Sequence, residues 1–565
     1  MAVENLITEH IDIWTSAVKT RSTSGRGSSK KLELYGIKKL RKLILELAVH
    51  GKLVPQDPND EPADILVQRI MAKKKELLAD GTLKKAKKSK VHDAIISAEE
   101  LPLGWVAADF GDITFNLDAQ RIPLSVSERK GRQGIYDYYG ASGVIDSIDA
   151  YLFDKPLLLI GEDGANLVNR STPIAFMARG KYWVNNHAHV IDGISEDFLI
   201  YLSLYINSIS LIPYITGMAQ PKMNQAKMNS ILVLLPPEKE QHRIVAKVDE
   251  LMTLCDQLEQ QTEASIEAHQ VLLTTLLDTL TNSADANELM QNWARISEHF
   301  DTLFTTEESI DQLKQTILQL AVMGKLVPQD PTDEPAAELL KRIAEEKAQL
   351  VKEKKIKKHP AVEPIGELGD IPQSWERIVV QDFADIKLGS TPSRHESKYW
   401  NGDIPWVSSG EVANNIIYDT NEKITHDGFM NSSTSIIPKR SLLMAIIGQG
   451  KTRGQTALLE VDACTNQNVA AFIFNENFVI PEYVWLWAKS KYDAHRQGGH
   501  GGAQPALNAK KVRSFAFPLP PTSEQKKIVE RVEEIHSVCD HLAARLKEGQ
   551  NTQIQLTDAI VGQVM

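Results

Sequence analysis

AVHGKLVPQDPNDEPA occupies residues 48–63 of this chain, and AVMGKLVPQDPTDEPA occupies residues 321–336. The second copy lies 273 positions after the first and differs only at His50/Met323 and Asn59/Thr332. The apolar run before Gly51 predicts a helix that ends there, because glycine takes the left-handed conformation of a helix C-cap and the following prolines prevent continuation. We interpret the stretch as a corner that closes a helical segment. The corner is used twice because the helical segment is used twice.

A second repeat has a different spacing. LPPEKEQHRIVAKVDELMTLCDQL begins at Leu235 and LPPTSEQKKIVERVEEIHSVCDHL begins at Leu519, so these copies are 284 residues apart. Apolar residues recur every three or four positions in both copies, as in Ile244, Val248 and Leu251, which predicts helices that pack along a seam. Each pair of prolines ends the strand before it, and a helix begins just behind. We expect roughly thirty helical residues, about 45 Å, in each copy.

The order of the repeats indicates a circular permutation of a twofold repeat. Residues 236–360 contain the counterparts of residues 520–565 followed by residues 1–97, and a weaker match relates EHID at residue 9 to EHFD at residue 298. The two chain ends should therefore pack together and rebuild one helical unit. The predicted fold class is α+β, with two α/β domains separated by two long antiparallel, coiled-coil-like helices. The predicted parts are an N-terminal helical region (1–97), a first insert domain (98–235), a central helical region (236–360), a second insert domain (361–519) and a C-terminal helix (520–565).

The two insert domains share their ends and differ in between. The first opens with LPLGW and closes with AQPKMN, whereas the second opens with IPQSW and closes with AQPALN. Short β-branched runs, turn residues and one amphipathic helix in each, at residues 195–208 and 481–492, predict compact α/β domains. The stretches between these ends hardly align. A common framework with different inserts indicates that the geometry of the helical framework is kept, whereas the two insert domains recognise different features.

The composition is that of an ordinary globular chain. A length of 565 residues requires more than one hydrophobic core, and 42% hydrophobic with 24% charged residues excludes a disordered or fibrous protein. The acidic N-terminal stretch and the short apolar runs predict neither a signal peptide nor a membrane span, so we expect a cytoplasmic protein with no membrane partner. Cys255, Cys464 and Cys539 are isolated thiols, which argues against disulfides and against a cysteine-bound zinc.

The net charge of −11 has the wrong sign for a protein that binds nucleic acid through its overall field. Any contact with DNA must therefore be local. Two lysine clusters, at residues 73–90 and 352–358, follow the two corners at about the same distance, and they fit either a solvated helix face or a surface that contacts phosphates. Residues 101–235 sum to −3 and residues 371–519 to +1, so neither insert domain has a basic footprint.

Catalytic and metal-binding motifs are missing from the sequence. AIIGQGKT at residues 445–452 has Ala445 where a phosphate-binding loop requires its first glycine, and we predict a turn between strands there. His187 and His189 have no third ligand at a useful spacing, so a strand is a better interpretation than a metal site. No N-P-P-[FY] or D-P-P-[FY] motif for methyl transfer occurs. We predict no catalytic residue and no metal site.

Two divergent domains, each followed by a helix that opens with LPP-x-x-EQ, and the repeated GKLVPQDP corner resemble the specificity subunit of type I restriction-modification enzymes. The resemblance covers essentially the whole chain. It implies a non-catalytic subunit whose two target recognition domains each read one half of an asymmetric bipartite DNA site, while the helices set the spacer. It also implies partners: double-stranded DNA, two modification subunits and two restriction subunits. This chain would bind no cofactor, because S-adenosylmethionine for adenine N6 methylation, and ATP with Mg²⁺, would belong to those subunits.

Base-reading residues are expected on loops between the shared ends of each domain. Side chains that make bidentate contacts distinguish base pairs, with arginine favoured for guanine and asparagine for adenine. A surface position without base contact is the alternative for each candidate. Asn224 and Asn508 hold matched positions behind the AQP turns, so we predict that they stabilise turns. The candidates are Arg121, Arg129, Lys130, Arg132, Tyr136, Tyr139, Ser142 and Asn169 in the first domain, and Thr391, Ser393, Arg394, Ser408, Ser409, Lys451 and Arg453 in the second.

Two other functions stay open on the sequence alone. A self-contained DNA methyltransferase or nuclease would transfer methyl groups or cut DNA as the purified chain, and the missing motifs argue against it. A symmetric adaptor would join proteins without touching DNA. The adaptor would give no partner-dependent, sequence-selective shift of a duplex.

Overall fold

The computed structural model describes residues 3–22, 30–85, 101–217, 220–284, 286–448, 451–497 and 507–564. The chain divides into two compact units. Unit 1 comprises Met1–Thr23, Ser29–Ala264 and Gln550–Met565, and the described residues of unit 2 lie within Ser265–Gly549. Unit 1 therefore contains both ends of the chain, as the permuted repeat predicts.

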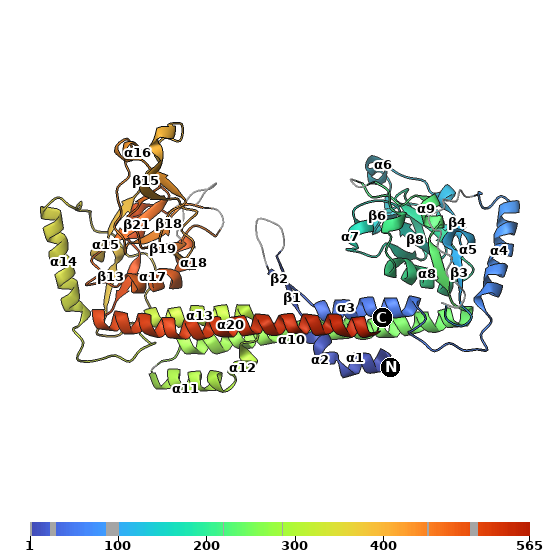
Figure 1. Cartoon of the computed structure of the whole chain (residues 1–565), viewed down its shortest axis with the longest axis horizontal. Helices are drawn as coiled ribbons and strands as arrows, with labels where there is room; N and C mark the ends of the chain where they lie inside the picture. Colours follow the sequence, from blue (N-terminus) through green and yellow to red (C-terminus); the bar gives the residue numbers. More distant parts are fainter. Residues whose placement is uncertain are drawn as a thin grey trace. The chain divides into compact units, whose positions relative to one another are not determined.

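Two long helices pass from one unit into the other. α10 (Glu238–Thr281) has 44 residues and runs from unit 1 into unit 2, whereas α20 (Thr522–Val564) has 43 and runs from unit 2 into unit 1 (Figure 1). Both begin directly behind the paired prolines, as predicted. The expected length of roughly thirty residues was too short. No proline interrupts either helix, so both continue beyond the repeated motif.

In each unit the corner joins two of the shorter helices, α3 to α4 in unit 1 and α13 to α14 in unit 2. In unit 1, α3 ends before Gly51, which has a φ of 67°, and Lys52 N donates to Leu47 O at 2.9 Å. In unit 2, Gly324 has a φ of 71°. The corner is a helix C-cap in both copies, as predicted. The elements are α1 (Val3–Glu9), α2 (Ile11–Ser16), α3 (Tyr35–Val49) and α4 (Ala63–Ala79) in unit 1, and α11 (Ala286–Glu298), α12 (Phe300–Leu303), α13 (Glu307–Val322) and α14 (Ala336–Lys352) in unit 2.

The first insert domain contains two four-stranded sheets, with strand orders β4-β11-β8-β9 and β6-β5-β10-β7. A third, two-stranded sheet pairs β3 with β12 and joins the two ends of the domain. The predicted amphipathic helix is α8 (Glu196–Ser208). The strands are β3 (Val106–Asp109), β4 (Phe115–Asn116), β5 (Gln133–Gly140), β6 (Gly143–Ile148), β7 (Phe153–Asp154), β8 (Leu157–Gly161), β9 (Ala175–Ala178), β10 (Lys181–Val184), β11 (Ala188–Asp192) and β12 (Leu232–Leu235), and the further helices are α5 (Phe110–Ile113), α6 (Val126–Lys130), α7 (Asn166–Asn169) and α9 (Gln225–Asn229).

The second insert domain has sheets of order β14-β21-β18-β19-β16 and β17-β15-β20, and β13 pairs with β22. Its amphipathic helix is α17 (Pro481–Ser490). The strands are β13 (Glu376–Val379), β14 (Asp385–Leu388), β15 (Trp400–Val407), β16 (Asn415–Ile417), β17 (Glu422–Ile424), β18 (Leu442–Ala445), β19 (Thr456–Leu459), β20 (Cys464–Thr465), β21 (Val469–Ile473) and β22 (Ala516–Leu519), and the further helices are α15 (Val380–Phe383), α16 (His426–Met430), α18 (Tyr492–Gln497) and α19 (Ala509–Arg513).

The two insert domains share one sheet topology that their sequences do not reveal. The order β4-β11-β8-β9 corresponds to β14-β21-β18-β19, and β6-β5-β10 corresponds to β17-β15-β20. In each domain the pair β5/β10 or β15/β20 is parallel, and the other shared pairs are antiparallel. The residues hardly align, as expected, but the backbone plan is common.

The predicted helical seam is buried. Ile244, Val248 and Leu251 of α10 are buried, and so are Ile528 and Val532 of α20. The three cysteines are free and buried, as the sequence predicts. Within the described ranges, no helix is both long and apolar enough to cross a membrane.

Candidate nucleic-acid interface

In unit 1 the corner is tied to the start of the long helix α10. Trp105 Nε1 donates to Glu240 Oε2 at 3.1 Å, and Gln56 Nε2 donates to Glu240 Oε1 at 3.3 Å. The Glu240 residue is only 1% exposed, and burial raises the pKa of its carboxyl group. The carboxylate therefore joins the corner, the first tryptophan of the insert domain and the helix at one buried point.

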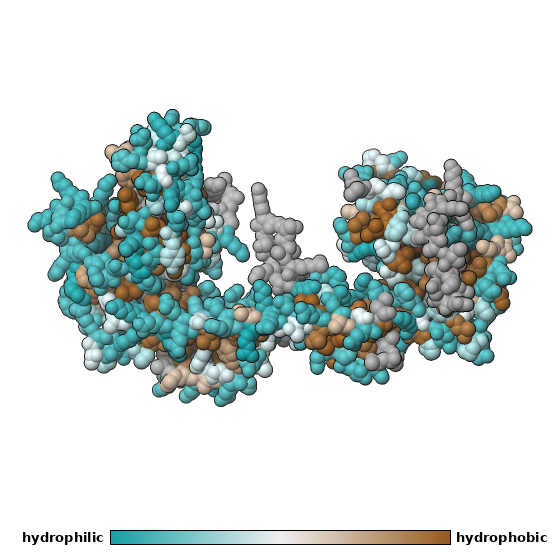
Figure 2. Space-filling model, in the orientation of Figure 1, coloured by the Kyte–Doolittle hydropathy of each residue, from teal (hydrophilic) through white to brown (hydrophobic). Residues whose placement is uncertain are grey.

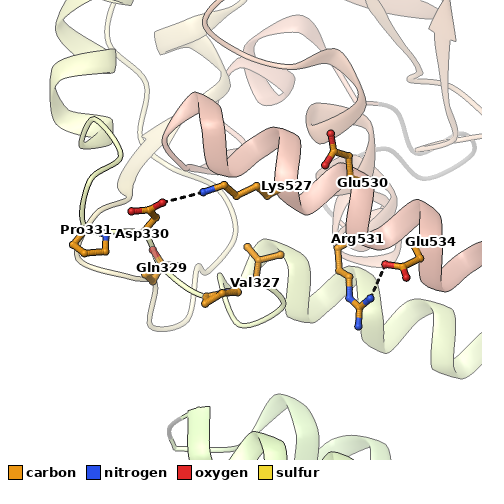
Figure 3. Close-up of a pocket in the computed structure, with 9 residues that line it drawn as sticks. Val327, Gln329, Asp330, Pro331, Lys527, Glu530, Arg531 and Glu534 are labelled. Atoms are coloured by element: carbon orange, nitrogen blue, oxygen red, sulfur yellow. Dashed lines mark hydrogen bonds and ion pairs between the residues drawn. The ribbon is translucent and has the colours of Figure 1, made fainter.

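Unit 2 repeats this junction with the matched residues. Trp375 Nε1 donates to Glu524 Oε2 at 2.9 Å, and Gln329 Nε2 donates to Glu524 Oε1 at 2.6 Å. Lys527 of α20 also forms an ion pair with Asp330 of the corner at 3.3 Å, and this pair is drawn in Figure 3. The GKLVPQDP corner is thus conserved between the two copies because it binds the EQ segment of the following helix in both.

A lysine fixes each insert domain to its neighbouring helix. Lys74 of α4 donates to the carbonyls of Gly111 and Thr114 at the end of α5, with the second bond 2.9 Å long. Lys347 of α14 donates in the same way at the end of α15, to Ala384 O at 3.3 Å. A lysine at a helix C-terminus satisfies its free carbonyls. One member of the first predicted lysine cluster is therefore a structural contact.

The other lysines of the two clusters lie on α4 and α14 or follow these helices in the sequence. Lys73 and Lys75 lie on α4, and Lys352 ends α14. Lys355 pairs with Glu353 at 2.8 Å. Lys87, Lys88 and Lys90 lie outside the described residues.

In the first insert domain an arginine lies over an aromatic ring of β5. The Arg129 guanidinium carbon is 4.9 Å from the centroid of the Tyr138 ring. Arg129 Nε donates to Asp146 Oδ2 at 2.8 Å, and Asp146 on β6 is the cross-strand partner of Tyr138. This hydrogen bond is the main cause that lowers the pKa of Asp146. The guanidinium plane is therefore oriented by one ring and one carboxylate.

The second insert domain has the same arrangement on the equivalent strands. The Arg394 guanidinium carbon is 5.1 Å from the centroid of the Trp406 ring on β15 and 3.7 Å from that of Trp400. Arg394 donates to Glu422 Oε2 at 2.9 Å, and Glu422 on β17 is the cross-strand partner of Trp406. The Arg394 side chain is 50% exposed, against 14% for Arg129. We refer to Arg129, Tyr138 and Asp146, and to Arg394, Trp406 and Glu422, as the two arginine triads.

Some candidates of the first domain are occupied by internal contacts. Arg121 donates to Ala188 O at 2.6 Å and to Glu162 at 3.1 Å, and its side chain is 13% exposed. The ring of Tyr139 stacks against Phe176 with centroids 6.0 Å apart. These partners lie 37 or more residues away, so local sequence reasoning could not identify them. Both residues therefore act in packing, and their contact with DNA stays a prediction.

The remaining candidates of the first domain lie nearer the surface. Arg132 pairs with Asp149 at 2.8 Å and lies 4.9 Å from the centroid of the Trp183 ring. Tyr136 makes an edge contact with Tyr151. The exposed candidates are Lys130 at the end of α6, Ser142 in the β5–β6 turn and Asn169 at the end of α7.

The candidates of the second domain fall on three loops. Thr391 Oγ1 donates to Gln467 at 2.6 Å, and Ser408 Oγ donates to Glu411 at 2.9 Å. Arg453 donates to Arg496 O at 3.1 Å. Thr391, Ser393 and Arg394 follow β14, Ser408 and Ser409 follow β15, and Lys451 and Arg453 lie between β18 and β19. Figure 2 shows mostly hydrophilic residues on the visible outer surface of this domain, at the left.

The structure shows where three of the sequence motifs lie. Asn224 Oδ1 accepts from Lys227 N at 3.0 Å and Asn508 Oδ1 from Lys511 N at 2.9 Å, so both asparagines cap short helices. His189 lies on β11, as predicted, and is hydrogen-bonded to Asp118 at 2.6 Å, whereas His187 lies in the turn before this strand. AIIGQGKT connects the antiparallel strands β18 and β19, although residues 449–450 lie outside the description. The described residues contain no cluster of three potential metal ligands.

Sequence reasoning missed the acidic members of the arginine triads. The role of Asp146 and Glu422 follows from the strand register, which places each acid opposite an aromatic residue. No local sequence signal indicates them, because the acids lie on β6 and β17 whereas the aromatic residues lie on β5 and β15. Without the register, neither acid can be assigned to an arginine.

The chain thus carries two different insert domains of one topology on a repeated helical framework. The family model described as "Type I restriction modification DNA specificity domain" matches residues 102–268 and 372–550. The chain is 38% identical over 600 residues to the type I restriction enzyme EcoAI specificity subunit of Escherichia coli, with 99% of each chain covered. The chain therefore belongs to the family of type I restriction-modification specificity subunits.

A second relative agrees with this assignment. The EcoEI specificity subunit of Escherichia coli is also 38% identical, over 606 residues and 99% of each chain. A solved structure concerned with complex assembly and conformational transition of the type I restriction-modification system contains a chain that is 15% identical. The match covers 82% of this chain and 98% of that one, with a TM-score of 0.45.

Proposed function

We propose that this chain is the DNA sequence-specificity subunit of a type I restriction-modification complex. The observation that supports it is the contrast between framework and insert. The junctions at Glu240 and Glu524 match residue by residue, while the loops above the shared sheets differ. An asymmetric bipartite site needs two different readers on one support. Each insert domain is then a target recognition domain that binds one half-site.

The arginine triads are the strongest candidates for contact with bases among the predicted residues. Arginine can contact guanine O6 and N7 with two donors, and such a pair discriminates by about 1–3 kcal/mol. A ring and a carboxylate hold Arg129 and Arg394 in a fixed plane before DNA arrives, which reduces the ordering cost of binding. The exposed candidates Lys130, Asn169 and Lys451 would supplement them.

The chain itself would carry out no reaction. Two modification subunits would supply S-adenosylmethionine-dependent adenine N6 methylation, and two restriction subunits would supply ATP- and Mg²⁺-dependent translocation and cleavage. The complex would act in the cytoplasm. The helices α10 and α20 would set the spacer and provide the docking surface for the modification subunits.

Exchange of one recognition domain tests the proposal. Residues 101–235 are replaced by the corresponding segment of another specificity subunit, and the hybrid is assembled with the modification subunits. Long-read detection of methylated bases should show one altered half-site and one retained half-site. Alteration of both half-sites would refute independent reading by the two domains.

The same preparations separate the alternative functions. Methyl transfer or DNA cleavage by the purified chain alone would support a self-contained enzyme. A complex that assembles fully but never shifts any duplex selectively would support a protein adaptor. The proposal requires a selective shift that depends on the modification subunits.

A further inference from the structure

The N-terminal helical copy contains a strand pair that has no counterpart in the central copy. EHID and EHFD are 289 residues apart, whereas the corners are 273 apart, so the N-terminal copy is 16 residues longer between these points. This extra length includes β1 (Lys19–Ser22) and β2 (Lys30–Glu33), an antiparallel pair between α2 and α3. In the central copy only three residues separate α12 from α13.

The β1–β2 ribbon and the adjoining helix are basic only in the N-terminal copy. Residues 19–42 contain nine Lys or Arg residues and one acid, Glu33. The matched end of the central copy, residues 304–315, contains one basic residue and three acids. Three lysines of α3 change as a group: Lys38, Lys39 and Lys42 correspond to Asp311, Gln312 and Gln315. The asymmetry is large for a chain with a net charge of −11.

The framework requires only part of this positive charge. Arg41 of α3 pairs with Asp256 of α10 at 2.7 Å, and its counterpart Lys314 pairs with Asp540 of α20. This contact is common to both units and therefore belongs to the helical framework. The basic residues without a counterpart are therefore not required by the shared framework, and they indicate a contact that only unit 1 makes.

Two of the additional lysines are only weakly bound. Lys38 pairs with Glu33 at 2.5 Å and Lys42 with Glu46 at 3.0 Å, and the two lysine side chains are 61% and 67% exposed. Exposed ion pairs are weak in water and open readily. Both ammonium groups are therefore accessible to another anion.

A groove of about 660 Å³ connects the base of the ribbon to the first insert domain. Lys19 lies in this groove, with its Nζ 3.5 Å from the centroid of the Tyr35 ring. The cations outnumber the acids that line it, Glu33 and Glu46. The lining cations are Lys19, Lys38, Lys39, Lys42 and Arg170.

We propose that the β1–β2 ribbon and the exposed lysines of α3 bind the phosphate backbone of duplex DNA without reading its sequence. This inference rests on the proposed function, because it assumes that the first insert domain holds DNA beside the groove. Sequence-independent affinity for DNA comes mainly from Lys and Arg contacts to phosphates. This contact would bind DNA only on the side of the half-site that the first insert domain holds.

The composition of the ribbon favours a nucleic acid over a protein partner. Residues 19–31 consist only of Lys, Arg, Ser, Thr and Gly. Protein interfaces are enriched in aromatic residues and depleted of lysine, whereas DNA interfaces are strongly positive.

The test measures the salt dependence of DNA binding by the complex with modification subunits. One variant carries Lys31→Gln, Lys38→Gln and Lys42→Gln, which leaves the pair of Lys39 with Asp558 intact. The control carries Lys341→Gln, Lys352→Gln and Lys358→Gln, and so loses the same charge around α14. Dissociation constants are measured for a cognate duplex and for one with scrambled half-sites, between about 50 and 200 mM salt.

In the ribbon variant, the slope of log K against log salt should become less steep by about 2–3. Each lost phosphate contact removes about 0.9 from this slope. Its affinity should fall by the same factor for both duplexes, and its melting temperature should match the wild type. A variant with residues 18–34 replaced by Phe-Thr-Thr, the link of the central copy, should also show a less steep slope, because it lacks the cations of the ribbon.

Three results would overturn the inference. The first is an unchanged slope in both ribbon variants. The second is an equal loss in the α14 control, which would indicate bulk charge. The third is weaker assembly of the complex at an unchanged slope, which would assign the surface to an acidic protein segment. A wild-type complex that binds both duplexes equally would instead refute the proposed function itself.

Discussion

At the level of single residues, one buried carboxylate holds each copy of the corner. Glu524 accepts from Trp375 and Gln329, so removal of its side chain leaves two donors without their acceptor. We expect Glu524→Ala to lower the free energy of unfolding by about 1–3 kcal/mol. Exposed Glu530 on the same helix is the control, and Glu530→Ala should change it by less than about 0.5 kcal/mol. Urea unfolding would measure both, and equal effects would contradict this role.

The same carboxylate predicts a pH dependence with a definite sign. Burial raises the pKa of Glu524, so its contribution to stability is fully present below the pKa of the unfolded chain and is lost as the pH rises through the folded value. Glu524→Gln has no such titration. The difference in unfolding free energy, wild type minus Glu524→Gln, should therefore decrease from pH 4 to pH 7. A difference that increases with pH would show that the carboxylate is stabilised in its charged form.

The triad of the second insert domain predicts an effect confined to one half-site. If Arg394 reads a base, Arg394→Ala should weaken binding of the cognate duplex about 10–100-fold, equivalent to about 1–3 kcal/mol. The same variant should bind unchanged to a duplex whose second half-site is already scrambled. Exposed Lys439 provides the control, because Lys439→Ala removes one charge from the same domain. Equal losses on both duplexes would assign Arg394 to phosphate contact or folding.

Residue identity predicted the framework better than the interface. The LPP-x-x-EQ motif pointed to the segment around Glu240 because both copies keep it, and Asn224 was assigned to a turn for the same reason. Arg121 looked like a surface reader, yet it is bound to Glu162 in the fold. The sequence could not predict that pairing, since it depends on which strands lie side by side.

At the level of elements, the corner depends on a glycine that tolerates no side chain. Gly324 has a φ of 71°, and a Cβ there would lie 2.4 Å from Pro372 Cγ. We expect Gly324→Ala to lower the free energy of unfolding by about 1–3 kcal/mol. Gly549 lies inside α20 with no atom near its Cβ position, so Gly549→Ala should stabilise by about 0.5–1 kcal/mol. Thermal unfolding would contradict the argument if both substitutions shifted the midpoint in one direction.

Helices could be predicted from the sequence more fully than sheets. The paired prolines predicted the start of α10 and α20, and Gly51 and the prolines behind it predicted the end of α3. The common topology of the insert domains escaped prediction, because a strand order is fixed by long-range pairing. Tyr138 and Trp406 hold equivalent places in β5 and β15 without any local sequence likeness.

At the level of the whole molecule, the two chain ends complete unit 1 together. Tyr35 Oη donates to Asp558 Oδ1 at 2.9 Å, and Lys39 pairs with Asp558 at 2.7 Å, across more than five hundred residues of sequence. The C-terminal part of α20 therefore belongs to unit 1, as the C-terminal part of α10 belongs to unit 2. A permuted chain obtains two similar units in this way while both long helices stay uninterrupted.

The passage of α10 and α20 between the units leads to a prediction about the spacer. Seven residues inserted after Ala264 and seven after Gly549 would lengthen both helices by about 10.5 Å and keep the apolar seam in phase. Under the proposed function, the recognised spacer should then grow by about three base pairs at 3.4 Å each. Methylation mapping of a library of spacer lengths would measure the change. An insertion in α10 alone, which shifts the two helices out of register, is the control and should impair every spacer. Altered half-sites at an unchanged spacer would refute the role of the helices as a ruler.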